Sequence, residues 1–242
     1  MKRILFLLTL LLVVTANTWA QKTFRSGNFI CLITNEVNSE VEIYNSDTTA
    51  VSVDIPLTVV DKNGERYNVT RIGKFGFADS KFLTHVTIPN SIKSIGKGAF
   101  INCKSLKQIN IPNSVVTIED HAFTNCKSLS YINIPSSVKS IGMLAFNYCN
   151  ALTYIAFPSS VERIGDHVFG NDSNVKKMKI HATVPPAVSD KAFLTCPSDM
   201  QVYVPAEALE AYKAAEGWKN LKLNTLTPRN KTVNRSVGFS AY

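Results

Sequence analysis

A block of 23 residues recurs through the middle of the chain, starting at Val69. Four copies follow one another without an insertion, and a weaker fifth copy starts at Val161. A sixth block, 184–205, keeps the pattern with one extra residue. A repeat of this length is typical of a solenoid, in which each unit, here called a rung, buries its apolar side only by stacking on its neighbours. We therefore expect a long binding surface rather than a single catalytic pocket.

The first 20 residues lie outside the repeat and have the features of a secretory signal peptide. Lys2 and Arg3 precede an apolar run, 4–14, and Ala20 offers a small residue at the cleavage position. We expect that residues 1–20 are removed and that the remainder is exported, to be secreted, held at the cell surface or kept in the periplasm. We also expect no transmembrane segment in the mature chain, because no later stretch approaches the roughly 20 apolar residues that span a bilayer.

A different pattern precedes the predicted six-repeat solenoid of residues 69–205. Within residues 21–68, segments such as 41–44 and 51–55 alternate apolar and polar side chains, and 61–64 is a strong turn sequence. This pattern predicts a small N-terminal β cap. A cap is expected because an uncovered first rung would expose the apolar core.

The segment after the repeats predicts a second cap. Residues 206–216 carry an apolar side typical of a short helix, and Gly217 follows as its stop. We expect a C-terminal helical cap within 206–223. Residues 224–242 are polar and have no periodicity, which predicts a flexible tail.

Apolar residues hold constant places within each repeat. With Val69 as position one, isoleucine takes position four and phenylalanine position nine, and positions fifteen, eighteen and twenty form an L-x-x-I-x-I run such as Leu106, Ile109 and Ile111. This run is the strand signature of a leucine-rich repeat. The sequence therefore predicts a β-rich leucine-rich repeat solenoid with one short parallel strand in every rung. Glycine recurs at position five, where we expect a bend at which a positive φ is favoured but not required.

The positions of the cysteines explain their odd number. Cys103, Cys126 and Cys149 share position twelve, and Cys196 takes the matching place in the sixth block. Equivalent residues of a solenoid stack one rung apart, so we expect an inward column of free, buried thiols. The rung spacing of about 4.8 Å also permits, by distance, a disulfide between neighbours. The chain has no closely spaced cysteine pair of the kind that binds zinc.

The motif I-G-x-x-A-F-x-x-C followed by L-x-x-I-x-I-P, at this period, resembles the BspA-like leucine-rich repeat family. The resemblance covers about 69–205, and the ending V-Y-V-P before a Y-K-x-A-x-x-W helix is similar to the closing unit of bacterial members. Repeat one lacks the cysteine, and repeat five lacks both cysteine and proline. The resemblance implies a surface or secreted protein, typical of Bacteroidetes, that acts as an adhesin or binding protein.

Two Asp-His pairs are the nearest approach to a catalytic or metal site in this sequence. His121 and His167 both occupy position seven, next to Asp120 and Asp166, but they lie two rungs apart, roughly 10 Å, which is too far to share one metal or proton. The chain contains no nucleophile elbow, zinc-protease motif or phosphate-binding glycine loop. We therefore predict that the protein is not an enzyme and that it has no catalytic residue, no metal site and no cofactor.

A surface is the better candidate for a site. Positions sixteen, seventeen and nineteen alternate with buried places in each strand and should face the concave side. Tyrosines flanked by asparagines on adjacent rungs make a rigid amphipathic platform for protein or glycan contacts, although β propensity alone also favours such residues on exposed strands. The predicted ligand-binding residues are His85, Gln108, Asn110, Tyr131, Asn133, Tyr154, Lys177, Lys179 and Tyr203.

The sequence thus predicts an exported, non-catalytic binding or adhesion module that holds a protein or glycan ligand. The alternative is a structural or accessory subunit of a bacterial envelope assembly. The formal charge of +8 falls to about +6 once Lys2 and Arg3 are removed, and no basic stripe is interleaved with aromatic residues. A nucleic-acid partner is therefore not expected. Neither the identity of the ligand nor the oligomeric state follows from the sequence.

Overall fold

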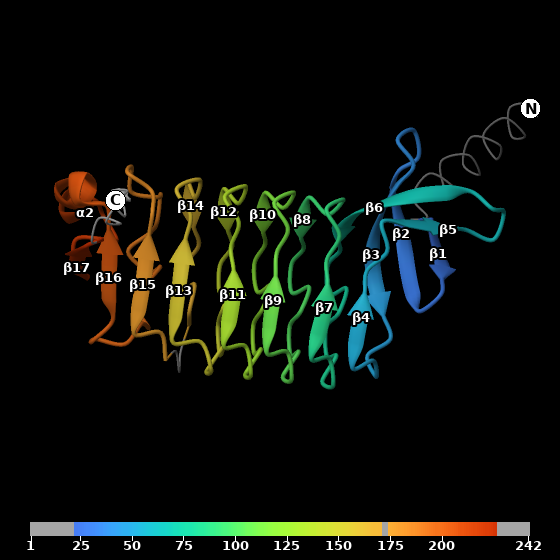
Figure 1. Ribbon diagram of the computed structural model, residues 1–242, viewed down its shortest axis with the longest axis horizontal. Helices are drawn as coiled ribbons and strands as arrows, with labels where there is room; N and C mark the ends of the chain where they lie inside the picture. The colour runs from blue at the N-terminus through green and yellow to red at the C-terminus, as the bar shows by residue number, and fades with distance from the viewer. Residues whose placement is uncertain (1–21, 171–173, 227–242) are drawn as a thin grey trace, which may run out of the picture.

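The computed structural model describes residues 22–170 and 174–226, which form an elongated solenoid (Figure 1). Successive rungs stack along the long axis, and most rungs carry a short strand on each of two opposite sides. The solenoid of parallel strands predicted from the repeat is confirmed. The predicted signal peptide, 1–20, lies outside the described residues.

One side of the solenoid, which we call the front face, carries the predicted L-x-x-I-x-I strands (Figure 1). These strands run parallel, and ladder hydrogen bonds join β4 to β7, β9 to β11, and β13 through β15 and β16 to β17. The front strands are β4 (Ser52–Asp54), β7 (His85–Thr87), β9 (Gln108–Asn110), β11 (Tyr131–Asn133), β13 (Tyr154–Phe157), β15 (Lys177–Ile180), β16 (Gln201–Val204) and β17 (Lys222–Thr225).

The opposite side, the back face, carries a second strand in most rungs; the sequence predicted only the one at 41–44, in the N-terminal cap. These strands pair in parallel as one continuous sheet. They are β3 (Glu40–Ser46), β6 (Arg66–Ile72), β8 (Ser94–Ile95), β10 (Thr117–Ile118), β12 (Ser140–Ile141) and β14 (Arg163–Ile164). Two-residue strands such as β8 are too short to show the alternation by which strands are recognised.

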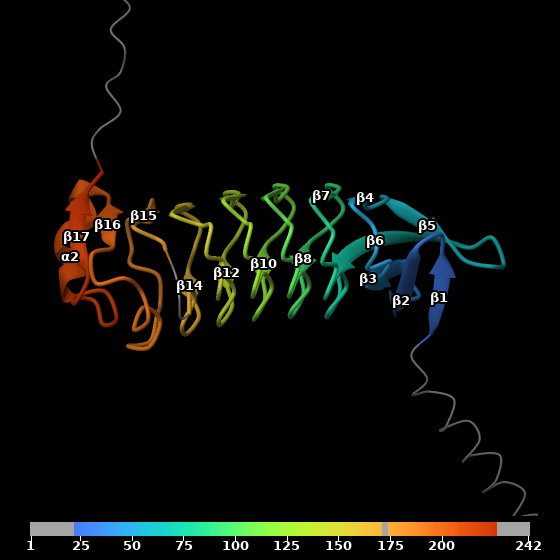
Figure 2. The ribbon, with the colours of Figure 1, turned by 90° about the horizontal axis from the view of Figure 1, so that it is seen from below.

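Strands on both sides affect the shape of the molecule. Neighbouring strands are about 4.8 Å apart wherever they pair, so the front and back of the solenoid advance by similar steps. Figures 1 and 2 accordingly show the rungs following a nearly straight axis. The front face is therefore a long, nearly straight strip, whereas the sequence analysis expected a concave face.

An antiparallel unit covers the N-terminal end. β1 (Thr23–Ser26) and β2 (Phe29–Asn35) form a hairpin, and β2 pairs antiparallel with β3. β3 and β4 then pair in parallel with β6 and β7, so both sides of the first repeat are covered. β5 (Thr58–Val60) lies antiparallel to β6 at the edge.

The C-terminal end departs from the prediction in two respects. The predicted helix over 206–216 is a 3-10 turn, η1 (Ala206–Ala208), followed by α2 (Leu209–Ala214), and the chain is already extended at Ala215. β17 (Lys222–Thr225) then pairs with β16 and adds a further rung. This strand spans residues 223 and 224, between which the predicted cap was to end and the predicted flexible tail to begin. The sequence did not show this strand because only one of its four residues is apolar. Residues 227–242 of the predicted tail lie outside the described residues.

The core consists of columns that run the length of the solenoid. The phenylalanines of position nine stack with centroid separations from 5.2 Å, between Phe77 and Phe100, to 6.2 Å, between Phe146 and Phe169. The cysteine column lies beside them, and all five cysteines are free thiols. Cys103 Sγ donates to the carbonyl oxygen of Phe77 at 3.1 Å, and Cys126 and Cys149 repeat this contact one and two rungs on.

The backbone turns at positions other than the one expected. The glycines of position five have no positive φ; they are needed because a Cβ on Gly142 would lie 2.3 Å from the backbone nitrogen of Asp120. Positive φ angles occur instead at positions seven and eleven, as at His121 (57°) and Asn102 (63°). Asparagine suits position eleven because it tolerates the left-handed region. There Asn125 Nδ2 donates to Asn102 Oδ1 at 2.6 Å, which joins adjacent rungs.

Candidate binding surface

The front face places its outward side chains in two parallel columns. Strand register aligns Tyr131 with Gln108 and Asn133 with Asn110, and it aligns Tyr154 with Lys177 and Lys179 with Tyr203. The first column is Ser52, His85, Gln108, Tyr131, Tyr154, Lys177, Gln201 and Lys222. The second column is Asp54, Thr87, Asn110, Asn133, Ala156, Lys179, Tyr203 and Asn224.

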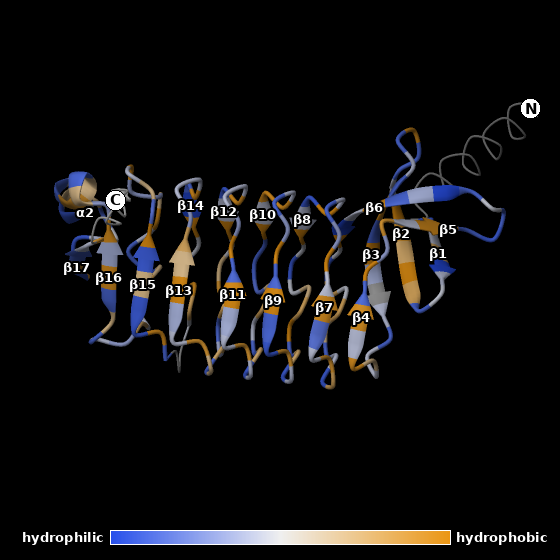
Figure 3. Cartoon of the chain, viewed as in Figure 1, coloured by the Kyte–Doolittle hydropathy of each residue, from blue (hydrophilic) through white to orange (hydrophobic). Residues whose placement is uncertain are grey.

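All nine residues predicted as ligand-binding lie in these two columns. The residue between the columns points inward, as Ile132 does in β11, so strands such as β9 and β11 show an apolar centre with polar flanks (Figure 3). The tyrosines are open to solvent, with 50% of Tyr131 and 40% of Tyr154 exposed. Lys179 and Tyr203 are half-buried. The structure therefore brings the predicted residues onto one strip.

Lysine and tyrosine side chains meet at the C-terminal half of the strip. Lys177 Nζ lies 4.7 Å from the ring centroid of Tyr203, and Lys179 Nζ lies 5.9 Å from that of Tyr154. An ammonium group over a tyrosine ring is attracted by the ring quadrupole. Partial burial, with a smaller effect from neighbouring Tyr131, raises the pKa of Tyr154, so its hydroxyl stays protonated at neutral pH. Both lysines are thus held against rings by a weak, orienting contact.

The strip extends at both ends beyond the nine predicted residues. At the C-terminal end, Asn224 Nδ2 donates to Gln201 Oε1 at 2.9 Å, and Lys222 extends the first column. Gln201 comes directly before V-Y-V, just as the position-seventeen residue of each repeat comes directly before the buried centre of its front strand. This spacing could have assigned Gln201 to the first column. At the N-terminal end, Asp54 of β4 joins the second column.

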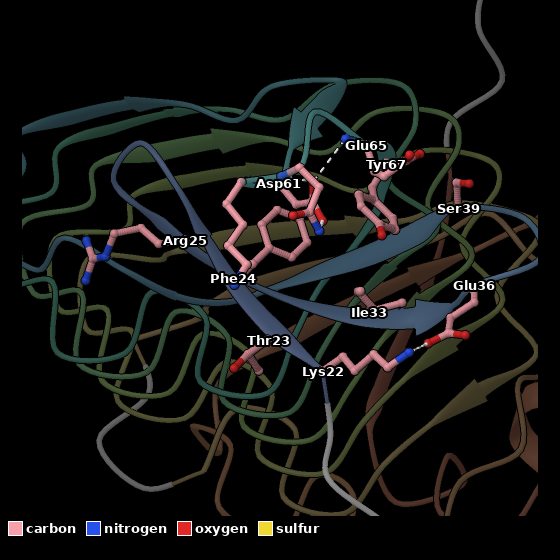
Figure 4. A pocket seen from close by; sticks show the side chains of 12 residues that line it. Lys22, Thr23, Phe24, Arg25, Ile33, Glu36, Ser39, Asp61, Glu65 and Tyr67 are labelled. Carbon is pink, nitrogen blue, oxygen red and sulfur yellow. Dashed lines mark hydrogen bonds and ion pairs between the residues drawn. The ribbon is translucent and has the colours of Figure 1, made fainter. Parts of the chain in front are cut away.

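A pocket of about 970 Å³ lies in the N-terminal unit, away from the strip. Figure 4 shows the rings of Phe24 and Tyr67 within it, and their centroids are 5.2 Å apart. Its rim is charged, and Lys22 Nζ pairs with Glu36 Oε1 across one side. The hydrogen bond and charge of that carboxylate raise the pKa of Lys22. Two of its rim charges, Lys22 and Glu36, already neutralise each other, and we take the strip as the better candidate.

A smaller pocket of about 380 Å³ lies at the C-terminal end. Cys196 lines it beside Phe193 and Met200. Burial raises the pKa of Cys196 to about 12, so the thiol is protonated and weakly nucleophilic at neutral pH. This environment does not favour thiol catalysis.

The two Asp-His pairs are accounted for by the turns. His121 and His167 both have positive φ, and their aspartates are engaged elsewhere: Asp120 Oδ1 accepts from Met143 N at 2.9 Å, and Asp166 accepts from the Ser189 hydroxyl. Within residues 22–170 and 174–226, no three His, Cys, Asp or Glu side chains gather as metal ligands would. No helix in that part of the chain is long and apolar enough to span a membrane.

Solved structures show the same fold. A leucine-rich repeat protein of T. pallidum is 23% identical with a TM-score of 0.60, and the match covers 84% of this chain and 81% of that one. A leucine-rich cell surface protein of Faecalibacterium prausnitzii is 23% identical with a TM-score of 0.62, covering 86% of this chain and 55% of the other. A leucine-rich repeat protein of Bacteroides ovatus is 26% identical with a TM-score of 0.58, and the match covers 77% of this chain and 56% of the other. The chain thus spans little more than half the length of the latter two.

Comparison at the level of families agrees with the repeat seen in the sequence. A search of curated proteins finds no match. The profile of the BspA type leucine rich repeat region matches residues 70–199 in six copies, which is more than half of the chain. The chain therefore belongs to the BspA-type leucine-rich repeat family.

Proposed function

We propose that this protein is an exported, non-catalytic binding or adhesion module that holds a protein or glycan ligand on its front face. The observation that carries the proposal is the register of the front strands, which aligns exposed tyrosine, amide and lysine side chains over successive rungs. Rigid aromatic side chains bordered by polar groups are typical of recognition surfaces. The binding residues are the nine residues of the strip named above.

The proposal includes a location outside the cytoplasm. The predicted signal peptide supports export, and a similar solved structure is described as a cell surface protein. Both secretion and attachment at the cell surface are consistent with a binding module whose partner lies outside the cell.

The experiment compares capture by the mature protein and by the double variant Tyr131→Ala/Tyr154→Ala. Ligands are drawn from the native envelope and, side by side, from host extracellular matrix. We expect capture to weaken about tenfold or more, with almost no change in the thermal midpoint, because exposed substitutions typically alter stability by about 0.5 kcal/mol or less. The control is Tyr44→Ala/Phe82→Ala, which removes two exposed aromatic residues that lie outside the strip.

The outcomes separate the proposal from its alternative. Full capture by the double tyrosine variant would show that the strip is not the binding surface. A stoichiometric partner from the native envelope that is retained by the tyrosine variant would instead support a structural or accessory subunit of an envelope assembly.

A further inference from the structure

The strip changes in charge along its length. Asp54 stands at its N-terminal end, and the middle rungs carry the uncharged residues Gln108, Asn110, Tyr131, Asn133 and Tyr154. The C-terminal rungs carry three lysines, Lys177, Lys179 and Lys222. A ligand lying along the strip would therefore contact hydroxyl and amide groups over the middle rungs and positive charge over the C-terminal rungs.

Lys177 and Lys179 have no acidic partner among residues 22–170 and 174–226. Their ammonium groups rest instead over the rings of Tyr203 and Tyr154, a contact that orients them without neutralising their charge. They are available to pair with negative charge on a ligand.

The lysines lean in opposite directions from the same strand. Lys179 reaches back to β13, and Lys177 reaches forward to β16. Strands β13 and β16 are separated by two rung steps, or about 10 Å. The positive charge is thus spread along the axis, which suits a ligand with acidic groups at more than one position.

From these features we infer that the ligand of the strip is an acidic polysaccharide, with carboxylate or sulfate groups over β13, β15 and β16 and sugar hydroxyls over β9 and β11. This inference rests on the proposed function of the strip. Amide side chains and tyrosine hydroxyls both donate and accept hydrogen bonds, as sugar hydroxyls do. The half-exposed ring of Tyr131 offers flat apolar area for the C–H face of a sugar ring.

The strip fits a polysaccharide better than an acidic protein segment. Protein partners gain most of their binding energy from apolar anchors that enter well-packed pockets. None of the nine predicted binding residues lines a described pocket. Only residues at the two ends of the columns do: Lys222 lines the C-terminal pocket, and Ser52 and Asp54 line a third pocket of about 350 Å³ beside β4. A shallow strip with repeated polar groups instead matches an extended polymer of hydroxylated rings.

The test measures binding of sodium polygalacturonate and heparin to the mature protein, with polygalacturonate methyl ester as the matched neutral probe. The variant is Lys177→Gln/Lys179→Gln. Its control is Lys74→Gln/Lys93→Gln, which removes two exposed charges off the strip, one of them, Lys74, also held 5.3 Å from an aromatic centroid. We expect at least one acidic polysaccharide to bind the mature protein. Its affinity should fall about tenfold or more in the strip variant and stay unchanged in the control variant.

Several results would overturn the inference. These are equal binding of the neutral ester, unchanged binding by the strip variant, no binding of either acidic polysaccharide, or equally tight, lysine-dependent binding of poly-glutamate or single-stranded DNA. The proposed function is judged separately, by the tyrosine variant. If capture depends on Tyr131 and Tyr154 but not on the lysines, the strip remains the binding surface and only its acidic ligand is rejected.

Discussion

Glu119 pairs with Arg71 across an intervening rung: Arg71 Nη2 donates to Glu119 Oε1 at 2.6 Å. Glu119 stands where other repeats have glycine, and the rung between the partners has Gly96 at that position. The second carboxylate oxygen of Glu119 accepts from the backbone nitrogen of Lys97 at 3.0 Å. The single exception in the glycine column therefore joins three successive rungs of the back face.

This contact predicts a modest loss of stability in Glu119→Gln. Both side chains are about one-third exposed, so solvent screens the pair and the loss should be about 1 kcal/mol or less. Urea unfolding measures it, and a double-mutant cycle with Arg71→Met isolates the coupling. Glu162→Gln, which breaks the more exposed pair with Lys139, is the control and should change little. A coupling energy of zero would show that the pair does not join the rungs.

The phenylalanine column predicts a much larger effect. Phe123 is fully buried between Phe100 and Phe146, so Phe123→Ala should reduce the free energy of unfolding by about 3 to 5 kcal/mol. Because solenoid stability depends on nearest neighbours, hydrogen exchange should also quicken in the adjacent rungs. Phe82→Ala is the control, because Phe82 is exposed and its replacement should change the free energy of unfolding little. A loss below about 1 kcal/mol for Phe123→Ala would contradict burial of the column.

The repeat made the interior predictable and left the turns and ends uncertain. Position nine could be assigned to the core because each phenylalanine recurs at the same place, and the outward residues of the front strands followed by alternation. The back strands of the repeats could not be predicted, since a pair such as Ser94–Ile95 carries no periodic signal. The glycines were misread because their requirement comes from backbone in the neighbouring rung, as at Gly142 and Asp120, which a single sequence does not display.

The candidate site was predictable in its residues but not in its contacts. The columns of Tyr131 and Tyr154 follow from the period alone. The placement of Lys179 over Tyr154 depends on side-chain directions across two strands, and that information is absent from the repeat. Lys222 and Asn224 were missed because β17 lies beyond the last recognisable repeat.

The C-terminal end predicts that Trp218→Phe destabilises the last rungs. Trp218 is fully buried, and its Nε1 donates to the carbonyl oxygen of Pro186 at 2.9 Å. Phenylalanine would leave that carbonyl without this donor, at a cost of about 1 to 3 kcal/mol. Hydrogen exchange should quicken at β16 and β17 and stay unchanged at β9. Tyr44→Phe, at an exposed residue of β3, is the control. Equal exchange in both variants would show that Trp218 does not hold the end in place.

The cysteine column predicts a loss of stability at alkaline pH. Burial raises the pKa of Cys103 and of Cys149 to about 12, and it raises the pKa of Cys126 well above its ordinary value of 9.0. Below about pH 8 the thiols are protonated in both folded and unfolded chains, so they contribute no pH dependence. Between about pH 9 and 12 only the unfolded thiols lose protons, which favours unfolding as pH rises.

At pH 10 this effect should lower the free energy of unfolding by about 1 kcal/mol for each buried thiol. The measurement is urea unfolding at pH 8 and pH 10 for the mature protein and for Cys103→Ser/Cys126→Ser/Cys149→Ser. Serine already occupies this position in repeat one, as buried Ser80, and its hydroxyl does not titrate in this range. The variant should lose less stability than the wild type over this interval, because lysines and tyrosines titrate equally in both proteins. Identical pH dependence would mean that the three thiols are not buried in the folded chain.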